Sequence, residues 1–208
     1  MKFYNYDLNG NQITIPSPES YKDCIQLIKS DRYRISGKIE SLPLLILHNM
    51  RPFKSSILFW FRLCQYDKGW LWLICRFMYK RACCKAQVQI PPATKVGYGL
   101  YLGGHDICIV INGGTVIGNN VNLAQFLNIG TNHHTPAIIG DNVYFGPHVS
   151  IVENVKIGNN SSIGAGAVVI KDVPENATVA GVPAKVLNYN NPGRYIYRPW
   201  PSTIKTAD

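Results

Sequence analysis

Hydrophobic residues recur every sixth position through the middle and later part of the chain. The residue after such an anchor is often Gly, and a small or β-branched residue often stands two positions before the next anchor. Six residues with two inward positions describe a short strand followed by a tight corner. Three such units form one triangular coil of a parallel β-helix, and stacked coils bury a continuous aliphatic column. The thirteen anchors are Ile90, Val96, Leu102, Ile111, Ile117, Leu123, Ile129, Ile139, Phe145, Ile151, Ile157, Ile163 and Val169.

The repeat is interrupted twice, and each interruption carries histidine. The step from Leu102 to Ile111 is nine residues and the step from Ile129 to Ile139 is ten, so about three and four residues leave the coil wall. The extruded segments are GGHDIC, with His105, and TNHHTP, with the adjacent pair 133–134. Imidazole titrates near neutral pH and accepts protons from hydroxyls. The two loops either overhang one groove or meet a neighbouring copy's loop across an interface.

The flanking regions follow other patterns. Residues 1–40 are polar and include a predicted helix from about Ser17 to Ser30. Residues 55–85 predict two helices separated near Gly69, with Arg and Lys among Phe, Trp and Leu. These helices either cap the first coil, the interpretation that we favour, or make peripheral contact with a membrane surface. We therefore divide the chain into a mainly helical region (1–87), a β-helix (88–187) and an extended tail (188–208) that runs back along the coil.

Composition narrows the classes of protein. The chain has 208 residues, of which 46% are hydrophobic and 16% charged, enough for a sizeable core. A net charge of +9 suits nucleic acid, an anionic membrane or an acidic ligand such as a phosphate-bearing cofactor, and the charge alone does not choose among them. Nucleic-acid binding is not indicated, because the aromatic residues cluster with apolar neighbours rather than along a basic groove. Six cysteines without a CxxC pair, and an N-terminus without an apolar signal core, predict free thiols and a cytoplasmic location.

The segment IGAGAVVIKDVPENATVAGVPAKVL at 163–187, the hexapeptide repeats and the IVIN after a histidine loop together resemble the left-handed β-helix acyltransferases. The resemblance is to the serine O-acetyltransferase branch and its relatives in polysaccharide gene clusters. It implies a mainly β fold, a left-handed parallel β-helix with an N-terminal helical region. It also implies a homotrimer and direct acetyl transfer from acetyl-CoA, bound between neighbouring coils. His105 falls on the family's general base, and His134 lies in the loop that carries its second active-site histidine.

Two departures from the family concern the group that orients His105. Gln89 stands where the family commonly has an aspartate, and Gly104 stands where an acidic residue often precedes the histidine. Gln89 or Asp106 is then the candidate to fix the imidazole, and Asp106 can supply a carboxylate. The acceptor is therefore serine or, as the alternative, a hydroxyl of a sugar or nucleotide-sugar used in surface polysaccharide biosynthesis.

The resemblance also implies a set of cofactor-binding residues. Small residues leave room for the pantetheine arm to approach the backbone, Pro147 removes one N–H, and two lysines match positions near the phosphates of CoA. The set is Gly146, Pro147, Gly164, Ala165, Lys171 and Lys185. Cys108 lies beside an apolar run, which favours core packing over a nucleophilic role.

A zinc-dependent carbonic anhydrase is a rival on the same coil. Such a site needs histidines spaced along one coil face. Here His133 and His134 are adjacent, while His105 and His148 lie 29 and 14 residues from His134. This spacing argues against a zinc site, and we predict that the protein uses no metal.

Overall fold

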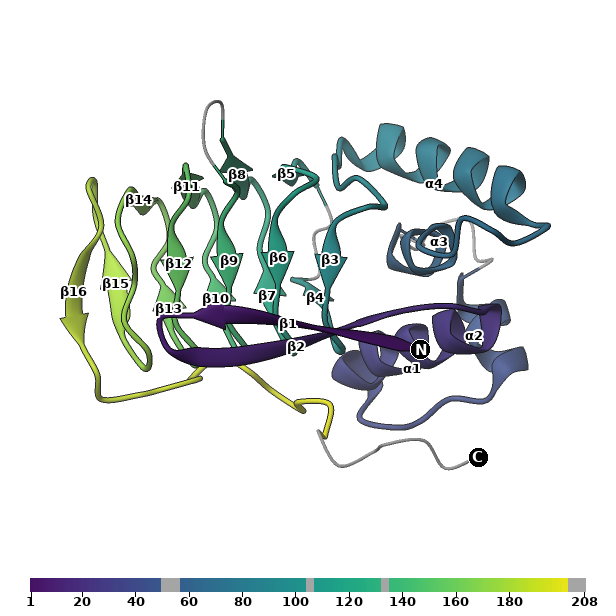
Figure 1. Cartoon of the computed structure of the whole chain (residues 1–208), viewed down its shortest axis with the longest axis horizontal. Helices are drawn as coiled ribbons and strands as arrows, with labels where there is room; N and C mark the ends of the chain where they lie inside the picture. Colours follow the sequence, from purple (N-terminus) through teal and green to yellow (C-terminus); the bar gives the residue numbers. More distant parts are fainter. Residues whose placement is uncertain (50–56, 104–106, 132–134, 202–208) are drawn as a thin grey trace.

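The computed structural model describes residues 1–49, 57–103, 107–131 and 135–201. About half of these residues form a left-handed parallel β-helix with three faces (Figure 1). The first face contains β4 (Tyr101–Leu102), β7 (Asn122–Leu123), β10 (Tyr144–Phe145), β13 (Ser162–Ile163) and β15 (Thr178–Ala180). The second contains β5 (Val110–Ile111), β8 (Asn128–Gly130), β11 (Ser150–Val152) and β14 (Val168–Val169). The third contains β3 (Lys95–Val96), β6 (Val116–Ile117), β9 (Ile138–Ile139) and β12 (Lys156–Ile157). The fold prediction is confirmed.

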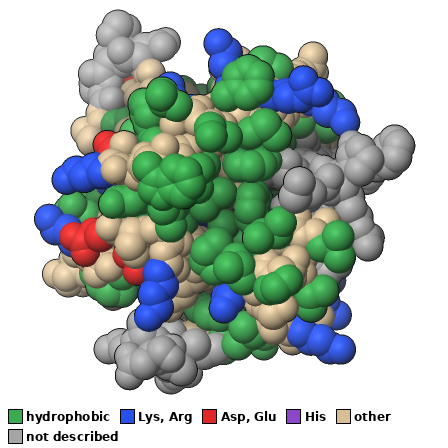
Figure 2. Space-filling view, turned by 90° about the vertical axis from the view of Figure 1, so that its right-hand side faces the viewer, with side chains coloured by type: hydrophobic (Ala, Val, Ile, Leu, Met, Phe, Trp, Pro, Cys, Tyr) green, Lys and Arg blue, Asp and Glu red, His purple; other side chains and the backbone are tan. Residues whose placement is uncertain are grey.

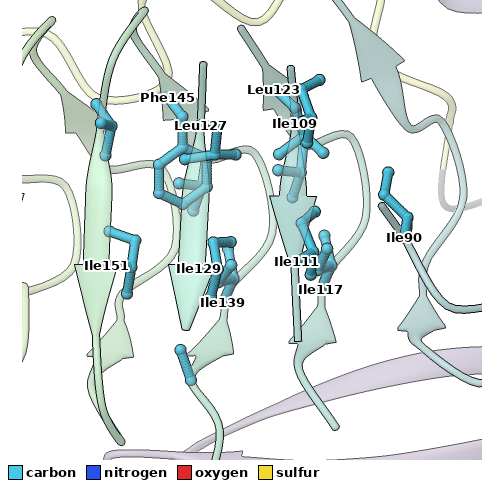
Figure 3. Packing of buried hydrophobic residues seen from close by; sticks show 14 of the residues in the cluster. Ile90, Ile109, Ile111, Ile117, Leu123, Leu127, Ile129, Ile139, Phe145 and Ile151 are labelled. Atoms are coloured by element: carbon cyan, nitrogen blue, oxygen red, sulfur yellow. The ribbon is translucent and has the colours of Figure 1, made fainter. Parts of the chain in front are cut away.

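A column of aliphatic side chains fills the coil (Figure 3). All thirteen anchors are buried, with Leu102 the most exposed at 5%. The smaller inward residues between anchors, such as Val121, Val143 and Val149, are also inaccessible to solvent. The apolar side chains of each rung therefore pack against those of the rung before it and the rung after it, as the six-residue pattern predicts.

The strand pairing on the third face gives the lengths of the two interruptions in the repeat. Lys95 pairs with Val116, Val116 with Ile138, and Ile138 with Lys156, which are separations of 21, 22 and 18 residues. Three regular units require 18 residues, so the first two coils contain three and four extra residues. This confirms the length of the two extrusions.

Three corners join the faces, and we name them by the faces they connect. The first corner, from first face to second, contains residues 103, 107–109, 124–127, 146–149 and 164–167. The second corner, from second face to third, contains residues 112–115, 131, 135–137, 153–155 and 170–172. The third corner, from third face to first, contains residues 97–100, 118–121, 140–143 and 158–161. The extra residues therefore fall at the first corner of one coil and the second corner of the next.

An antiparallel hairpin, which the sequence pattern did not predict, lies along the coil (Figure 1). It is formed by β1 (Lys2–Leu8) and β2 (Asn11–Ser17), and Asp7 accepts a 2.9 Å bond from Lys156 Nζ. The following helix, α1 (Tyr21–Ser36), starts at the N-cap Ser20 and ends at Gly37 in the left-handed conformation. The predicted helix is thus present and continues about six residues beyond Ser30.

Three further helices close one end of the coil: α2 (Leu42–Asn49), α3 (Ile57–Cys64) and α4 (Trp72–Ala86). As predicted, α3 and α4 are separated near Gly69, and their buried side chains join the coil's core. Phe61 and Tyr79 pack in the same cluster as Ile90, the first anchor. We refer to α1–α4 as the cap.

The C-terminal residues return along the third corner toward the cap. Strand β16 (Lys185–Asn188) pairs antiparallel with β15. Beyond it, Gly193 N donates to Asn160 O at 2.8 Å, and Trp200 N donates to Asn120 Oδ1 at 2.7 Å. The tail therefore passes the rungs in reverse order, as predicted.

Candidate functional site

The segment that carries His105 and four of the predicted cofactor residues belong to one corner. Residues 107–109 together with Gly103, then 124–127, 146–149 and 164–167, are successive levels of the first corner. Backbone bonds stack these levels: Phe126 N donates to Ile107 O (3.4 Å), His148 N to Gln125 O (3.1 Å) and Gly166 N to Pro147 O (2.8 Å). His105 and Asp106 lie outside the described residues. Their described neighbour Gly103 donates to Leu123 O at 2.8 Å, which holds the start of the segment on the first face.

The small residues at this corner have two different uses. A Cβ added to Gly146 would lie 2.7 Å from Ala165 N, and one added to Gly164 would lie 2.9 Å from Ala180 Cβ. These two glycines therefore allow adjacent rungs to stack. By contrast, Ala165 and Gly166 are exposed, and a Cβ on Gly166 would meet no atom within 4 Å. The open backbone at this corner is the Ala165–Gly166 stretch.

An aromatic pair lies on the same corner: sequence spacing places His148 in this region, but it did not find the partner Phe126. The rings of Phe126 and His148 are stacked, with centroids 4.4 Å apart and an interplanar angle of 13°. Both side chains are exposed, and both residues have positive φ, at 61° and 59°. Gly166 occupies the equivalent position of the next level with φ of 70°. Aligning the coils at their corners, instead of at their anchors, is the signal that would have found this pair.

The two predicted phosphate-binding lysines lie at different places on the coil. Lys171 follows β14 at the second corner, whereas Lys185 begins β16. The turn before Lys185 lies over β14, because Val168 N donates to Gly181 O (3.0 Å) and Ala184 N donates to Val168 O (2.8 Å). Both lysine side chains are exposed. Within one chain, the two lysines therefore do not lie at the same corner of the coil.

The second histidine segment belongs to the second corner. His133 and His134 lie outside the described residues, between β8 and β9. At the described start of the segment, Thr131 Oγ1 donates to Glu153 Oε2 at 2.8 Å. The segments of His105 and His134 therefore leave the coil at opposite edges of the second face.

Gln89 and Cys108 lie beside the His105 segment. Gln89 extends the second face by a parallel bridge to Val110, and its side chain is exposed. Its N–H donates to Ile109 O at 2.7 Å, and its carbonyl accepts from Ile111 N at 2.8 Å. Cys108 is half-buried, and its Sγ donates to Gln87 Oε1 at 3.2 Å. The thiol is thus at the edge of the core, not inside it.

A cavity of about 1100 Å³ lies at the third corner, between the hairpin and the C-terminal tail. None of the predicted site residues within the described ranges lines it. Its corner amides bond to one another: Asn142 Nδ2 donates to Asn160 Oδ1, and Asn160 Nδ2 to Asn176 Oδ1, each at 3.0 Å. Burial raises the pKa of Asp141, whose Oδ1 accepts from Asn119 N at 2.7 Å. These bonds describe a structural ladder that holds the rungs together.

Comparison with known proteins finds similarity to acetyltransferases. A family model described as bacterial transferase hexapeptide (six repeats) matches residues 136–171. The serine acetyltransferase of Buchnera aphidicola subsp. Schizaphis graminum is 34% identical over 128 residues, which are 57% of this chain and 49% of the relative. That of Escherichia coli K12 is 33% identical over 127 residues, 57% of this chain and 46% of the relative. The chain spans about half the length of these curated relatives.

Solved structures agree over a larger share of the chain. The serine acetyltransferase of Neisseria gonorrhoeae has a TM-score of 0.60 and 33% identity, and the match covers 81% of this chain and 68% of that one. A serine acetyltransferase in complex with CoA has a TM-score of 0.66 and 25% identity, covering 82% and 72%. Sequence repeat, coil geometry and these likenesses lead to one conclusion. The chain belongs to the hexapeptide-repeat acyltransferases, on the branch that resembles the serine O-acetyltransferases.

Proposed function

We propose that this protein transfers the acetyl group of acetyl-CoA to the hydroxyl of serine, with His105 as the general base. The observation that carries the proposal is the first corner, where the described flanks of the His105 segment and the open backbone of Ala165–Gly166 belong to one stack, with the levels of 124–127 and 146–149 between them. The solved relatives support the two ligands, because one is a complex with CoA and another, from Neisseria gonorrhoeae, is a complex with serine.

The chemistry requires only a proton acceptor and groups that hold the reactants. His105, neutral before reaction, accepts the hydroxyl proton while the hydroxyl oxygen attacks the thioester carbonyl carbon. As the carbon–sulfur bond breaks, the imidazolium returns this proton to the departing sulfur, which leaves as a thiol. Asp106 or Gln89 keeps the imidazole in the tautomer that can accept. No covalent enzyme intermediate is needed.

The residues present fit acetyl-CoA as the acyl donor, which supplies an activated thioester. Ala165 and Gly166 offer exposed backbone along the first corner, and no neighbouring atom closes the space beside Gly166. Gly146, Pro147 and Gly164 build the stack that aligns this strip. Exposed Lys185 and Lys171 supply positive charge for the phosphates.

We further propose that the site forms between copies in a homotrimer. The segments of His105 and His134 leave at opposite edges of the second face, so a site that uses both takes them from two chains. In such an assembly the first corner of one copy faces the second corner of the next. Lys171, at the second corner, then contributes from the neighbouring copy. In this arrangement each loop meets a neighbouring copy's loop across an interface, which is the second of the two alternatives that the spacing of the loops leaves open.

The test is CoA release, followed as free thiol, with serine and with a panel of amino sugars, hexoses and nucleotide-sugars. We expect serine-dependent release, and His105→Ala lowers kcat by about 10²–10⁴ while acetyl-CoA binding is retained. The control is His48→Ala, in α2 at the capped end. Release with a sugar alone would keep the mechanism and replace serine as the acceptor. Absence of acetyl-CoA binding would overturn the proposal.

A further inference from the structure

The capped end of the molecule exposes a large apolar surface (Figure 2). On α4 and the turn before it, Trp70, Leu73, Ile74 and Phe77 are between 57% and 85% exposed. On α2, hydrophobic side chains that include Leu44 and Leu47 also face solvent. In Figure 2 hydrophobic side chains run through the middle of this end face, with Lys and Arg mostly toward its rim. Soluble monomers rarely expose contiguous apolar patches of more than a few hundred Å².

Packing of the cap does not account for this surface. The inner side of α4 is buried through Cys75 and Tyr79, which join the core of the coil. Leu73, Ile74 and Phe77 are spaced three and four residues apart, so they share the opposite, outer side. The helix is therefore apolar on both sides over its first half, and the described part of the chain covers only the inner side.

Positive charge surrounds the same surface. Residues 65–86 carry five basic residues and one acidic residue, Asp67, which gives +4 of the chain's +9. All six of these side chains are exposed. The basic residues are Lys68, Arg76, Lys80, Arg81 and Lys85. The outer side of α4 is consequently apolar in its first half and basic in its second half, and the guanidinium of Arg76 lies 4.9 Å from the ring centre of Trp72.

We propose that this end face binds the surface of an anionic lipid bilayer. Face-to-face pairing with a second copy would bring two positively charged surfaces together, whereas anionic headgroups neutralise them. Trp70 and Phe77 suit the boundary between headgroups and acyl chains, and the basic side chains reach the phosphates. Among the helices of the described ranges, none has the length and apolar character to cross a bilayer. The contact that we propose is peripheral, with α4 lying along the membrane plane.

Cosedimentation with vesicles tests the proposal on the whole chain. We compare vesicles of phosphatidylcholine mixed with phosphatidylglycerol and vesicles of phosphatidylcholine alone. We expect binding to the mixed vesicles only, weakened by salt because the attraction is partly electrostatic. Two double variants, L73S/F77S and K80Q/R81Q, should each lower the bound fraction, the second by about tenfold or more in affinity.

Matched controls carry the same changes elsewhere on the surface. L187S/Y197S removes two exposed apolar side chains on the C-terminal segment, and K2Q/R194Q removes two exposed charges outside the cap. Both should bind mixed vesicles like the parent. Equal binding to both vesicle types, or equal losses in cap variants and controls, would overturn the proposal. So would an L73S/F77S variant that binds vesicles normally but sediments as a smaller assembly in ultracentrifugation, because the face would then join copies of the chain.

Discussion

The coil and the cap solve the same problem, an exposed backbone edge, by different means. Within the coil, an N–H of one rung donates to a carbonyl of the next, as Gly97 does to Ile117 and Gly118 does to Ile139. The first rung has no earlier rung to donate to its carbonyls. There the cap supplies side-chain donors: Arg62 bonds Val96 O (2.9 Å) and Gly97 O (2.6 Å).

A second guanidinium does the same at the third corner. Arg34 donates to Gly99 O at 2.8 Å, to Asn122 Oδ1 at 2.6 Å and to Tyr197 O at 3.0 Å. Burial lowers the pKa of Arg34 to about 10, so the side chain stays charged at neutral pH. The coil thus grows by repeated backbone bonds and apolar contacts, whereas its closure depends on a few buried charged residues. In the cap, loss of stability on substitution should therefore be concentrated at single positions. In the coil, the effect of a substitution should be shared among neighbouring rungs.

The largest expected loss of stability follows from breaking the buried pair of Asp31 and Arg62. Asp31 Oδ2 accepts from Arg62 Nε at 2.8 Å, and Oδ1 accepts from Nη2 at 2.9 Å. Asp31→Ala leaves the guanidinium, which is 0% exposed, without its counter-ion. We expect the free energy of unfolding to fall by about 3–5 kcal/mol, measured by urea denaturation. Asp7→Ala, which breaks the exposed pair with Lys156, should cost far less. Equal losses would show that the buried pair does not hold the cap.

A substitution in the middle of the coil tests the other side of the comparison. Ile139 is fully buried and pairs in register with Ile117 on one side and Ile157 on the other. Ile139→Ala should lower the free energy of unfolding by about 2–5 kcal/mol through lost contacts and a residual cavity. Because rungs interact with their nearest neighbours, hydrogen exchange should rise first in β6, β9 and β12. Ile170→Ala, at a half-exposed position, is the control. Exchange that rises equally in the cap would argue against this local coupling.

The same contrast explains what the sequence could predict. The coil could be predicted because one pattern repeats thirteen times, and a break in the pattern directly locates an extruded loop. The cap has no such redundancy: Arg62 appears in the sequence as an interruption of an apolar run, although it makes bonds that close the coil. The hairpin was missed because its buried side chains are few, with Leu8, Ile13 and Ile15 forming a small cluster with Val116.

For the candidate site, sequence spacing found the two loops but not the edges of the second face at which they leave the coil. That assignment needs the three faces in order, since three extra residues at one corner shift every later position. The role of each small residue was also ambiguous in the sequence. Gly146 and Gly166 look alike in the sequence, yet the first makes room for a neighbouring rung and the second borders open space.

The smallest effect that we predict is a loss of stability at alkaline pH that originates in the cap. Burial raises the pKa of the thiols of Cys24, on α1, and Cys64, on α3, to about 12. The unfolded chain ionises these groups from about pH 9, whereas the folded chain keeps them protonated. The folded state then binds more protons in this interval, so stability falls as pH rises, by about 1 kcal/mol per thiol between pH 9 and 10. Urea denaturation from about pH 8 to 10, below the usual ionisation of tyrosine, measures the slope. Cys24→Ala should remove about 1 kcal/mol of this fall, the share of one thiol, while Cys84→Ala, at an exposed thiol, should leave it unchanged. An unaltered slope in Cys24→Ala would place the pH sensitivity outside these buried thiols of the cap.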